Sequence, residues 1–193
     1  MAVNDILKLI QLKFPQLPEN CIEELSAQIT LKSYSKNEIL VKQGQYAKTA
    51  YLILEGMARA FYYVEEKDVT DWFAFENELI CPIVSFFSEK KSPHYIQVLQ
   101  NSIVVELKKE TVDILSKKYH QFNTIFQKEL TETLLRQQNR ISSILFYTAE
   151  NKYRRFIAAY PNVVDRIPVK HLASHLGMTL ETLSRIRKST ILI

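Results

Sequence analysis

Hydrophobic and polar positions along this chain repeat with two different periods, which divide it into helical and β segments. Residues 3–32 carry apolar side chains at helical spacing, interrupted at Pro15 and Pro18, and this pattern predicts two short helices. From Leu31 onwards the apolar runs are short and are separated by polar turns that contain Gly44 and Gly56. The predicted strands cover residues 38–42, 49–54, 58–64, 69–75, 95–99 and 103–107. Short strands with close turns indicate a β-roll or barrel.

The helical period returns after Leu107. It predicts a helix over 111–118, a long helix from about Gln121 and a last helix over 149–160, which ends at Pro161. Along the long helix, seven side chains are spaced by four or three residues, as in a coiled coil: Phe122, Phe126, Leu130, Leu134, Gln137, Ile141 and Ile144. This seam either packs on the chain's own sheet or pairs with a second copy, and we favour the second copy. We expect a hinge at residues 145–151.

Residues 167–188 show two helical patterns separated by a sharp break. Pro168 suits a first helical position, and apolar side chains recur after it as far as Gly177. Glycine readily adopts the positive φ of a turn that ends a helix. Two residues then form the turn, and a second helix covers about 180–188. This is the pattern of a helix-turn-helix.

The outward face of this second helix carries side chains that can read DNA bases. At about 100° per residue, one side of the helix presents Glu181, Ser184, Arg185 and Lys188, opposite Leu183 and Ile186. A guanidinium can bond O6 and N7 of guanine, a carboxylate can accept from N4 of cytosine, and a hydroxyl can serve either way. The simpler alternative is a surface hairpin with a Glu/Arg ion pair.

The charge distribution favours the DNA interpretation. The formal net charge is +4, and residues 150–193 hold eight cationic and three acidic side chains, a net of +5, which leaves −1 for residues 1–149. Besides the predicted reading residues, the cationic side chains that could neutralise phosphates are Lys152, Arg154, Arg155, Arg166, Lys170, Arg187 and Lys188. A solvated basic surface is the alternative, but the basic excess coincides with the predicted reading helix.

Length and the remaining composition set further bounds. A chain of 193 residues, 47% of them hydrophobic, can bury one core and a small satellite. No apolar run reaches about 18 residues, and residues 1–6 do not resemble a signal peptide, so we expect a cytoplasmic protein with no membrane contact. Cys21 and Cys81 have neither a metal-ligand spacing nor the number needed for an iron–sulfur cluster, and there is no haem-attachment pattern. We therefore expect two buried thiols and no cofactor.

The order of a β-roll, a long helix and a C-terminal helix-turn-helix resembles that of Crp/Fnr-type bacterial transcription regulators. Residues 38–44 and 50–56 are similar to the first part of a cyclic-nucleotide-binding roll, and residues 176–186 to the family's recognition helix, with its Glu-x-x-Ser-Arg pattern. The resemblance implies that Glu181, Ser184 and Arg185 read bases, and the two-fold seam implies an inverted-repeat site bound by a homodimer. The implied phosphate contacts are Lys170, Thr179 and Thr182, to which the charge analysis adds Lys188. RNA polymerase is a further implied partner.

The chain departs from the family pattern in two places. Members that bind cyclic AMP have a Gly-Glu-Leu turn followed by an Arg-Ser pair that holds the phosphate, whereas here the turn is 77–79 and the pair falls on Ser92-Pro93. A guanidinium and a backbone N–H are lost, so we expect cyclic AMP not to be the effector. The possible pocket for an unidentified small-molecule effector consists of Glu78, Leu79, Ser92, Gln137 and Gln138. The sequence also ends at residue 193, which predicts a short or absent wing after the helix-turn-helix.

The predicted fold class is α+β, in three parts. Residues 1–120 form N-terminal helices and a β-roll as the sensor domain, 121–148 the dimerisation helix and hinge, and 149–193 the helix-turn-helix DNA-binding domain. Two other functions stay open: a ligand- or partner-binding sensor that does not bind DNA, and a cupin-like metal enzyme. Cupins need two or three histidines, but the strand region holds only His94. His171 and His175 are spaced to hold a metal, although we expect them to face solvent or phosphate. We expect neither catalytic residues nor a metal.

Overall fold

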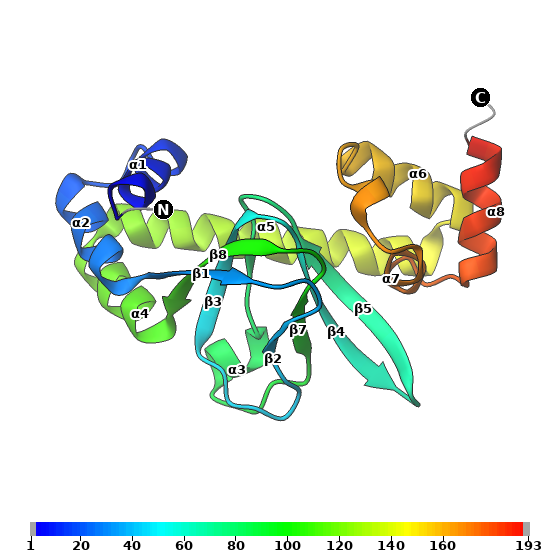
Figure 1. Ribbon diagram of the computed structural model, residues 1–193, viewed down its shortest axis with the longest axis horizontal. Helices are drawn as coiled ribbons and strands as arrows, with labels where there is room; N and C mark the ends of the chain where they lie inside the picture. Colours follow the sequence, from blue (N-terminus) through cyan, green and yellow to red (C-terminus); the bar gives the residue numbers. More distant parts are fainter. Residues whose placement is uncertain (1–2, 191–193) are drawn as a thin grey trace.

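The computed structural model describes residues 3–190, which fold into a β-roll flanked by helices (Figure 1). The helices are α1 (Val3–Lys13), α2 (Glu19–Gln28), α3 (Ile83–Ser88), α4 (Lys109–Lys118), α5 (His120–Phe146), α6 (Ala149–Ala159), α7 (Val169–His175) and α8 (Leu180–Thr190), with a 3₁₀ turn η1 at Val164–Arg166. The strands are β1 (Thr30–Tyr34), β2 (Ile39–Val41), β3 (Thr49–Glu55), β4 (Ala58–Val64), β5 (Lys67–Ala74), β6 (Leu79–Ile80), β7 (Tyr95–Val98) and β8 (Ser102–Lys108). The predicted α+β class is confirmed.

Two four-stranded antiparallel sheets form the roll, with strand orders β1-β8-β3-β6 and β2-β7-β4-β5. Their facing sides enclose an apolar core that includes Ile53, Ala58, Ala60 and Ile96, all with 0% exposure. Successive side chains of a strand point to opposite faces. Arg59 therefore lies on the other face of β4 from its two alanine neighbours, where its guanidinium reaches α7. This alternation places a charged group between the roll and the C-terminal helices.

The turn between β3 and β4 requires a glycine. Gly56 has a φ of +98°, and a Cβ there would lie 2.2 Å from the Ser102 Oγ and 2.9 Å from the Asn101 carbonyl oxygen. A side chain at this position would therefore be strained by both the backbone and the neighbouring strand. Gly44 and Gly177 also have positive φ, so the prediction that all three glycines serve turns is confirmed.

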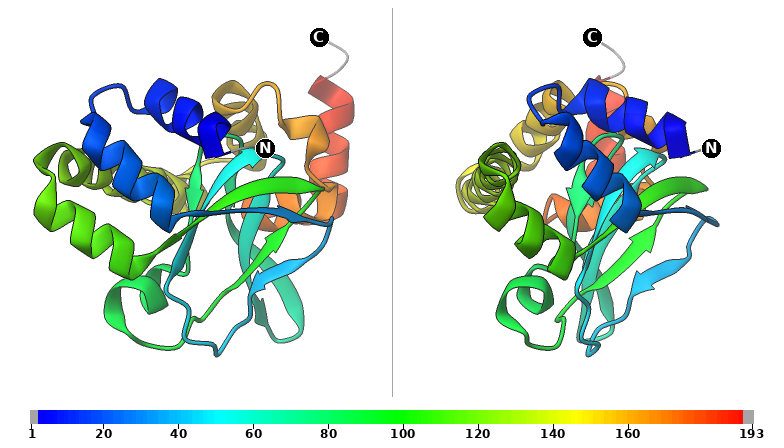
Figure 2. Two further views of the ribbon diagram at one scale, coloured as in Figure 1. Left: turned by 60° about the vertical axis from the view of Figure 1, so that its left-hand side comes forward. Right: turned by 90° about the vertical axis from the view of Figure 1, so that its left-hand side faces the viewer.

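The long helix α5 runs along the roll and connects two groups of helices (Figure 1). At one end, α1, α2 and α4 pack with the start of α5 around a core that includes Cys21, Phe86, Leu115 and Phe122. At the other end, α6, α7 and α8 share a core with the edge of the roll, where Phe73 and Phe75 belong to the same cluster as buried side chains of the helix-turn-helix. The right-hand view of Figure 2 looks along α5 and shows it beside the roll.

The elements that the sequence pattern missed are short or lie at an edge. β1 is a polar edge strand without a buried side chain, and β6 has two residues. α3 begins after Pro82 and has six residues, fewer than two turns, so its period is too short to recognise. A short or absent wing was predicted after the helix-turn-helix; Ser189 and Thr190 belong to α8, and residues 191–193 lie outside the described residues. Among the described helices, none has the length and apolar character needed to span a bilayer.

Candidate nucleic-acid interface and ligand cavity

The second helix of the predicted helix-turn-helix is α8. Gly177 ends α7 with a φ of +63°, and the Thr179 Oγ1 accepts a hydrogen bond from the Thr182 backbone N–H at 3.2 Å, which caps the start of α8. Leu183 and Ile186 are buried in the core of the C-terminal unit. The turn at Gly177, the Thr179 cap and the buried inner face of α8 together set the geometry of the helix-turn-helix.

The outer face of α8 carries the predicted base-reading residues. Glu181 and Arg185 are exposed and Ser184 is half-buried, all on the side opposite Leu183. A hydrogen bond with its own backbone N–H, and a second one with Thr179, lower the pKa of Glu181. The face therefore presents an anion near the start of α8 and a cation one turn later.

The predicted phosphate-contacting residues lie around this face. Lys170, Thr179 and Lys188 are exposed, and Thr182 is half-buried beside Thr179. Of the wider set of cationic side chains that could neutralise phosphates, Lys152 is buried, which corrects the expectation for it, and three others form ion pairs within the chain. Arg166 bonds Glu76, Arg187 bonds Asp165, Arg154 bonds Glu150, and Lys152 is buried.

The two histidines of α7 do not face solvent or phosphate, which corrects the expectation for them. His171 is 6% exposed, with its Nδ1 2.7 Å from the Arg59 guanidinium. The Nδ1 of His175 lies 3.0 Å from the Asp71 carbonyl oxygen on β5. Burial and a neighbouring arginine lower the pKa of His171 to about 4 and that of His175 to about 3. Both imidazoles are therefore neutral at pH 7 and join α7 to the roll.

Arg59 is the centre of the polar contact between α7 and the roll. Its guanidinium donates to both carboxylate oxygens of Asp68, one at 2.6 Å, and to the Thr70 Oγ1 at 3.0 Å. The Thr70 backbone N–H in turn donates to the Ser174 Oγ of α7 at 3.1 Å. Sequence reasoning missed this cluster, although a lone arginine between two alanines of a predicted strand was a usable signal.

A cavity of about 540 Å³ lies between the roll, α5 and α6. Three of the five residues expected in an effector pocket, Glu78, Leu79 and Gln137, line it together. The Glu78 carboxylate accepts from the Phe75 backbone N–H at 3.1 Å and lies 3.6 Å from the Arg136 guanidinium. Burial raises the pKa of Glu78, opposed by that hydrogen bond and by Arg136. The cavity therefore contains the Glu78 carboxyl group, close to Arg136, together with other side chains of the long helix.

The other two expected pocket residues lie elsewhere. Ser92 is 1% exposed, its backbone N–H donates to the Gln45 carbonyl oxygen at 2.8 Å, and its Oγ bonds the backbone of His94. Gln138 is exposed and does not line the cavity. Neither residue therefore meets Glu78 in this structure.

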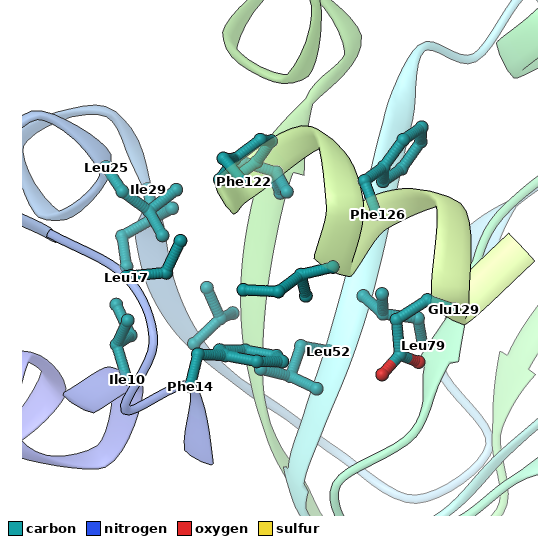
Figure 3. A pocket seen from close by; sticks show the side chains of 13 residues that line it. Ile10, Phe14, Leu17, Leu25, Ile29, Leu52, Leu79, Phe122, Phe126 and Glu129 are labelled. Atoms are coloured by element: carbon teal, nitrogen blue, oxygen red, sulfur yellow. The ribbon is translucent and has the colours of Figure 1, made fainter. Parts of the chain in front are cut away.

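The first two residues of the predicted seam face a second, smaller cavity. It has a volume of about 70 Å³ and lies among α1, α2, α5 and the first sheet, with Glu129 as its one charged lining residue (Figure 3). Phe122 and Phe126 face this cavity together with Phe14. The first two seam positions therefore pack within the chain, which corrects the expectation that the seam begins at Phe122. An apolar gap of this size is a packing defect too small for a nucleotide.

The remaining seam is an exposed apolar face of α5. The predicted positions Leu130, Leu134 and Ile141 lie along one side, and Leu145, which was not predicted, extends it, with exposures between 38% and 69%. The predicted positions Gln137 and Ile144 line the larger cavity instead, which corrects the expectation for them. At about 100° per residue, this side adjoins the face that lines the larger cavity. Tyr147 and Thr148 are non-helical between α5 and α6, within the predicted hinge.

The described residues contain no cluster of three or more His, Cys, Asp or Glu side chains that could hold a metal. Cys21 is buried, and burial raises the pKa of the Cys81 thiol to about 12. Both thiols are therefore protonated at neutral pH, which makes them poor metal ligands.

Comparison with known proteins finds one matching family and several similar regulators. Residues 31–119 match the family described as Cyclic nucleotide-binding domain. The Fumarate and nitrate reduction regulatory protein of Yersinia pestis is 26% identical, over 83% of this chain and 70% of that protein. Among solved structures, the c-di-GMP responsive global regulator CLP of Xanthomonas campestris superposes with a TM-score of 0.72 at 15% identity, over 91% of this chain and 92% of that one. FixK2 of Bradyrhizobium japonicum gives 0.70 at 16% identity, over 83% of each chain. Residues 31–119 therefore match a cyclic nucleotide-binding domain, and the sequence and fold of the chain are similar to those of Crp/Fnr-type transcription regulators.

Proposed function

We propose that this chain is a transcription regulator of the Crp/Fnr type that binds DNA sequence-specifically, with α8 in the major groove and Glu181, Ser184 and Arg185 reading base edges. The observation that carries the proposal is the outer face of α8, which lies at the edge of the molecule and presents these side chains opposite a buried apolar face (Figure 1). Lys170, Thr179, Thr182 and Lys188 then contact phosphates. The role is regulatory, with RNA polymerase as the partner at the promoter, and involves no catalysis.

Selection from random duplexes followed by gel shift tests this function. The selected sites should be inverted repeats, and Arg185→Ala should lose about 1–3 kcal/mol at one base position. Lys170→Ala should weaken all sequences alike and reduce the salt slope by about one. Arg187→Ala is the matched control, because Arg187 bonds Asp165 within the domain, and it should leave specificity unchanged. If no sequence is preferred over random DNA at moderate salt, the chain is a sensor without DNA binding.

The homodimer proposal rests on the exposed apolar face of α5. A second copy would cover Leu130, Leu134, Ile141 and Leu145, because apolar side chains repeating along one side of a long helix stabilise a coiled coil. Leu134→Glu should shift the protein from dimer to monomer in sedimentation and reduce DNA binding. Leu12→Glu, at a position of α1 that is 81% exposed, should leave both unchanged. A Leu134→Glu protein that stays dimeric would contradict this assignment.

The proposal further includes an effector other than cyclic AMP. Pro93 has no N–H, and the Ser92 N–H and Oγ are both engaged within the chain, so a cyclic phosphate finds neither a guanidinium nor a free donor at this pair. Calorimetry with the full chain should detect no micromolar binding of cyclic AMP. Micromolar binding that also strengthens DNA binding would contradict this part of the proposal.

A further inference from the structure

Two cationic side chains of α6 face the larger cavity without an acidic partner. Lys152 and Arg155 both line it. Lys152 is 9% exposed, and its Nζ lies 4.0 Å from the place of a Cβ at Gly177, so most of this side chain is buried between α6 and the turn before α8. Among the described residues, neither side chain forms an ion pair or a hydrogen bond, and the Arg155 guanidinium lies over the Tyr147 ring at 4.7 Å. A mostly buried cationic side chain without a partner is stabilised by an anion that lies beside it.

The other charged groups around the cavity do not supply that anion. Arg140 also lines it, and its guanidinium bonds Asp71 at 3.1 Å and the Thr70 carbonyl oxygen at 3.2 Å. Glu78 is the one acidic lining residue, and it lies closest to Arg136. The cavity therefore has four cationic lining residues and one acidic one, with the excess on the α6 side.

The same cavity has an aromatic wall. Trp72 and Phe75 come from the roll, and Phe156 and Tyr160 from α6 and the residue that follows it. The ring centroids of Phe75 and Tyr160 are 4.9 Å apart, and those of Phe156 and Tyr160 are 5.1 Å apart. Aromatic groups pack on such a wall by stacking or edge contacts. A volume of about 540 Å³ lies within the usual range of small-molecule sites.

We propose that this cavity binds a small aromatic anion, a carboxylate or phosphate ester, with its charge between Lys152 and Arg155 and its ring against the aromatic wall. Such a ligand would contact α6 of the DNA-binding unit and Trp72 of the roll at the same time. It therefore holds the two units in one relative orientation. Binding itself does not depend on the proposed function; only its effect on DNA affinity does.

The single tryptophan makes the site directly observable. Trp72 is the only tryptophan of the chain and lines the cavity, so its fluorescence reports on occupancy. Phenyl phosphate should change the fluorescence of the full chain saturably, and benzyl alcohol, an uncharged compound with the same ring, should bind at least tenfold more weakly. Arg155→Gln and Lys152→Met should each raise the Kd for phenyl phosphate by tenfold or more. Arg154→Gln is the control, because Arg154 is exposed on the same helix and pairs with Glu150.

The outcomes separate this proposal from its alternatives. No saturable change with phenyl phosphate, equal affinity for benzyl alcohol, or equal effects of Arg154→Gln and Arg155→Gln would overturn it. Arg155 is exposed, so Arg155→Gln keeps the test decisive if the buried Lys152→Met fails to fold. A gel shift on the same samples reads DNA binding separately. Saturable phenyl phosphate binding without DNA binding would remove the proposed function and leave this site standing.

Discussion

Replacing Arg59 with leucine should destabilise the junction between the roll and α7 far more than an ordinary surface substitution. The Arg59 side chain is 3% exposed and donates to Asp68, Thr70 and Gln97, with His171 of α7 at 2.7 Å. Removing one partner of a buried ion pair costs about 3–5 kcal/mol, because the remaining charge stays desolvated. Asp68 is 29% exposed, so water solvates part of the carboxylate, and we expect the lower end, about 3 kcal/mol.

A matched comparison isolates the effect of burial. Arg166 also joins the C-terminal unit to the roll, through Glu76, but the two side chains are 35% and 32% exposed. Arg166→Leu should therefore cost about 1 kcal/mol or less. For a chain of this length, about 3 kcal/mol lowers the melting temperature by about 6–12 °C. Urea unfolding and thermal melting of both variants measure the difference. Equal costs for the two substitutions would refute the argument that burial sets the strength of this junction.

Two further predictions concern acid stability and the glycine turns. Burial lowers the pKa of His175 in the folded chain to about 3, so as the pH falls the unfolded chain takes up the proton before the folded chain does. The contribution of His175 to stability is therefore full above about pH 6.5 and falls towards pH 3, by up to about 1.4 kcal/mol per pH unit. His175→Gln should flatten this slope in urea unfolding at pH 4–7. An unchanged slope would show that other groups cause the loss. Gly44→Ala should cost about 1 kcal/mol of stability, because the φ of Gly44 is +83° but no atom lies within 4 Å of an added Cβ. Gly56→Ala should cost about 1–3 kcal/mol more, because its Cβ would also contact Ser102. Equal melting temperatures of the two variants would contradict this prediction.

The fold was predictable because period and turn chemistry agree along most of the chain. The six predicted strands and the helix-turn-helix appear close to their expected bounds, since alternating runs such as 58–64 and the Gly177 break are strong local signals. β6 and α3 were not predicted because they are too short to show a repeat of apolar positions. Phe122 and Phe126 were assigned to the seam because apolar residues recur with the same spacing on a helix that packs against a second copy and on one that packs against its own sheet. Only tertiary packing decides between the two.

Residues of the candidate site were predictable where they lie on a single helix, and were not predictable where the site is formed by residues from several elements. Glu181, Ser184 and Arg185 share one helix, so their common face follows from the helical repeat. The neutral histidines of α7 depend on Arg59 and Asp71, more than 100 residues away. Ser92 follows Glu78 after β6 and α3, and a loop hydrogen bond to Gln45 holds Ser92 away from the cavity. Such distances between loops have no periodic signature.

The two non-helical residues between α5 and α6 make that junction a pivot. Two residues span at most about 7 Å, so the start of α6 cannot move far from the end of α5, whatever becomes of the contacts with the roll. Motion of the C-terminal unit is therefore rotation about a fixed point, with α6 as a lever of 11 residues, about 16 Å long. A turn of about 15° would carry its far end through about 4 Å. A change of one or two ångströms at Lys152, in the first turn of α6 and on the cavity wall, is thus enlarged at the far end of α6.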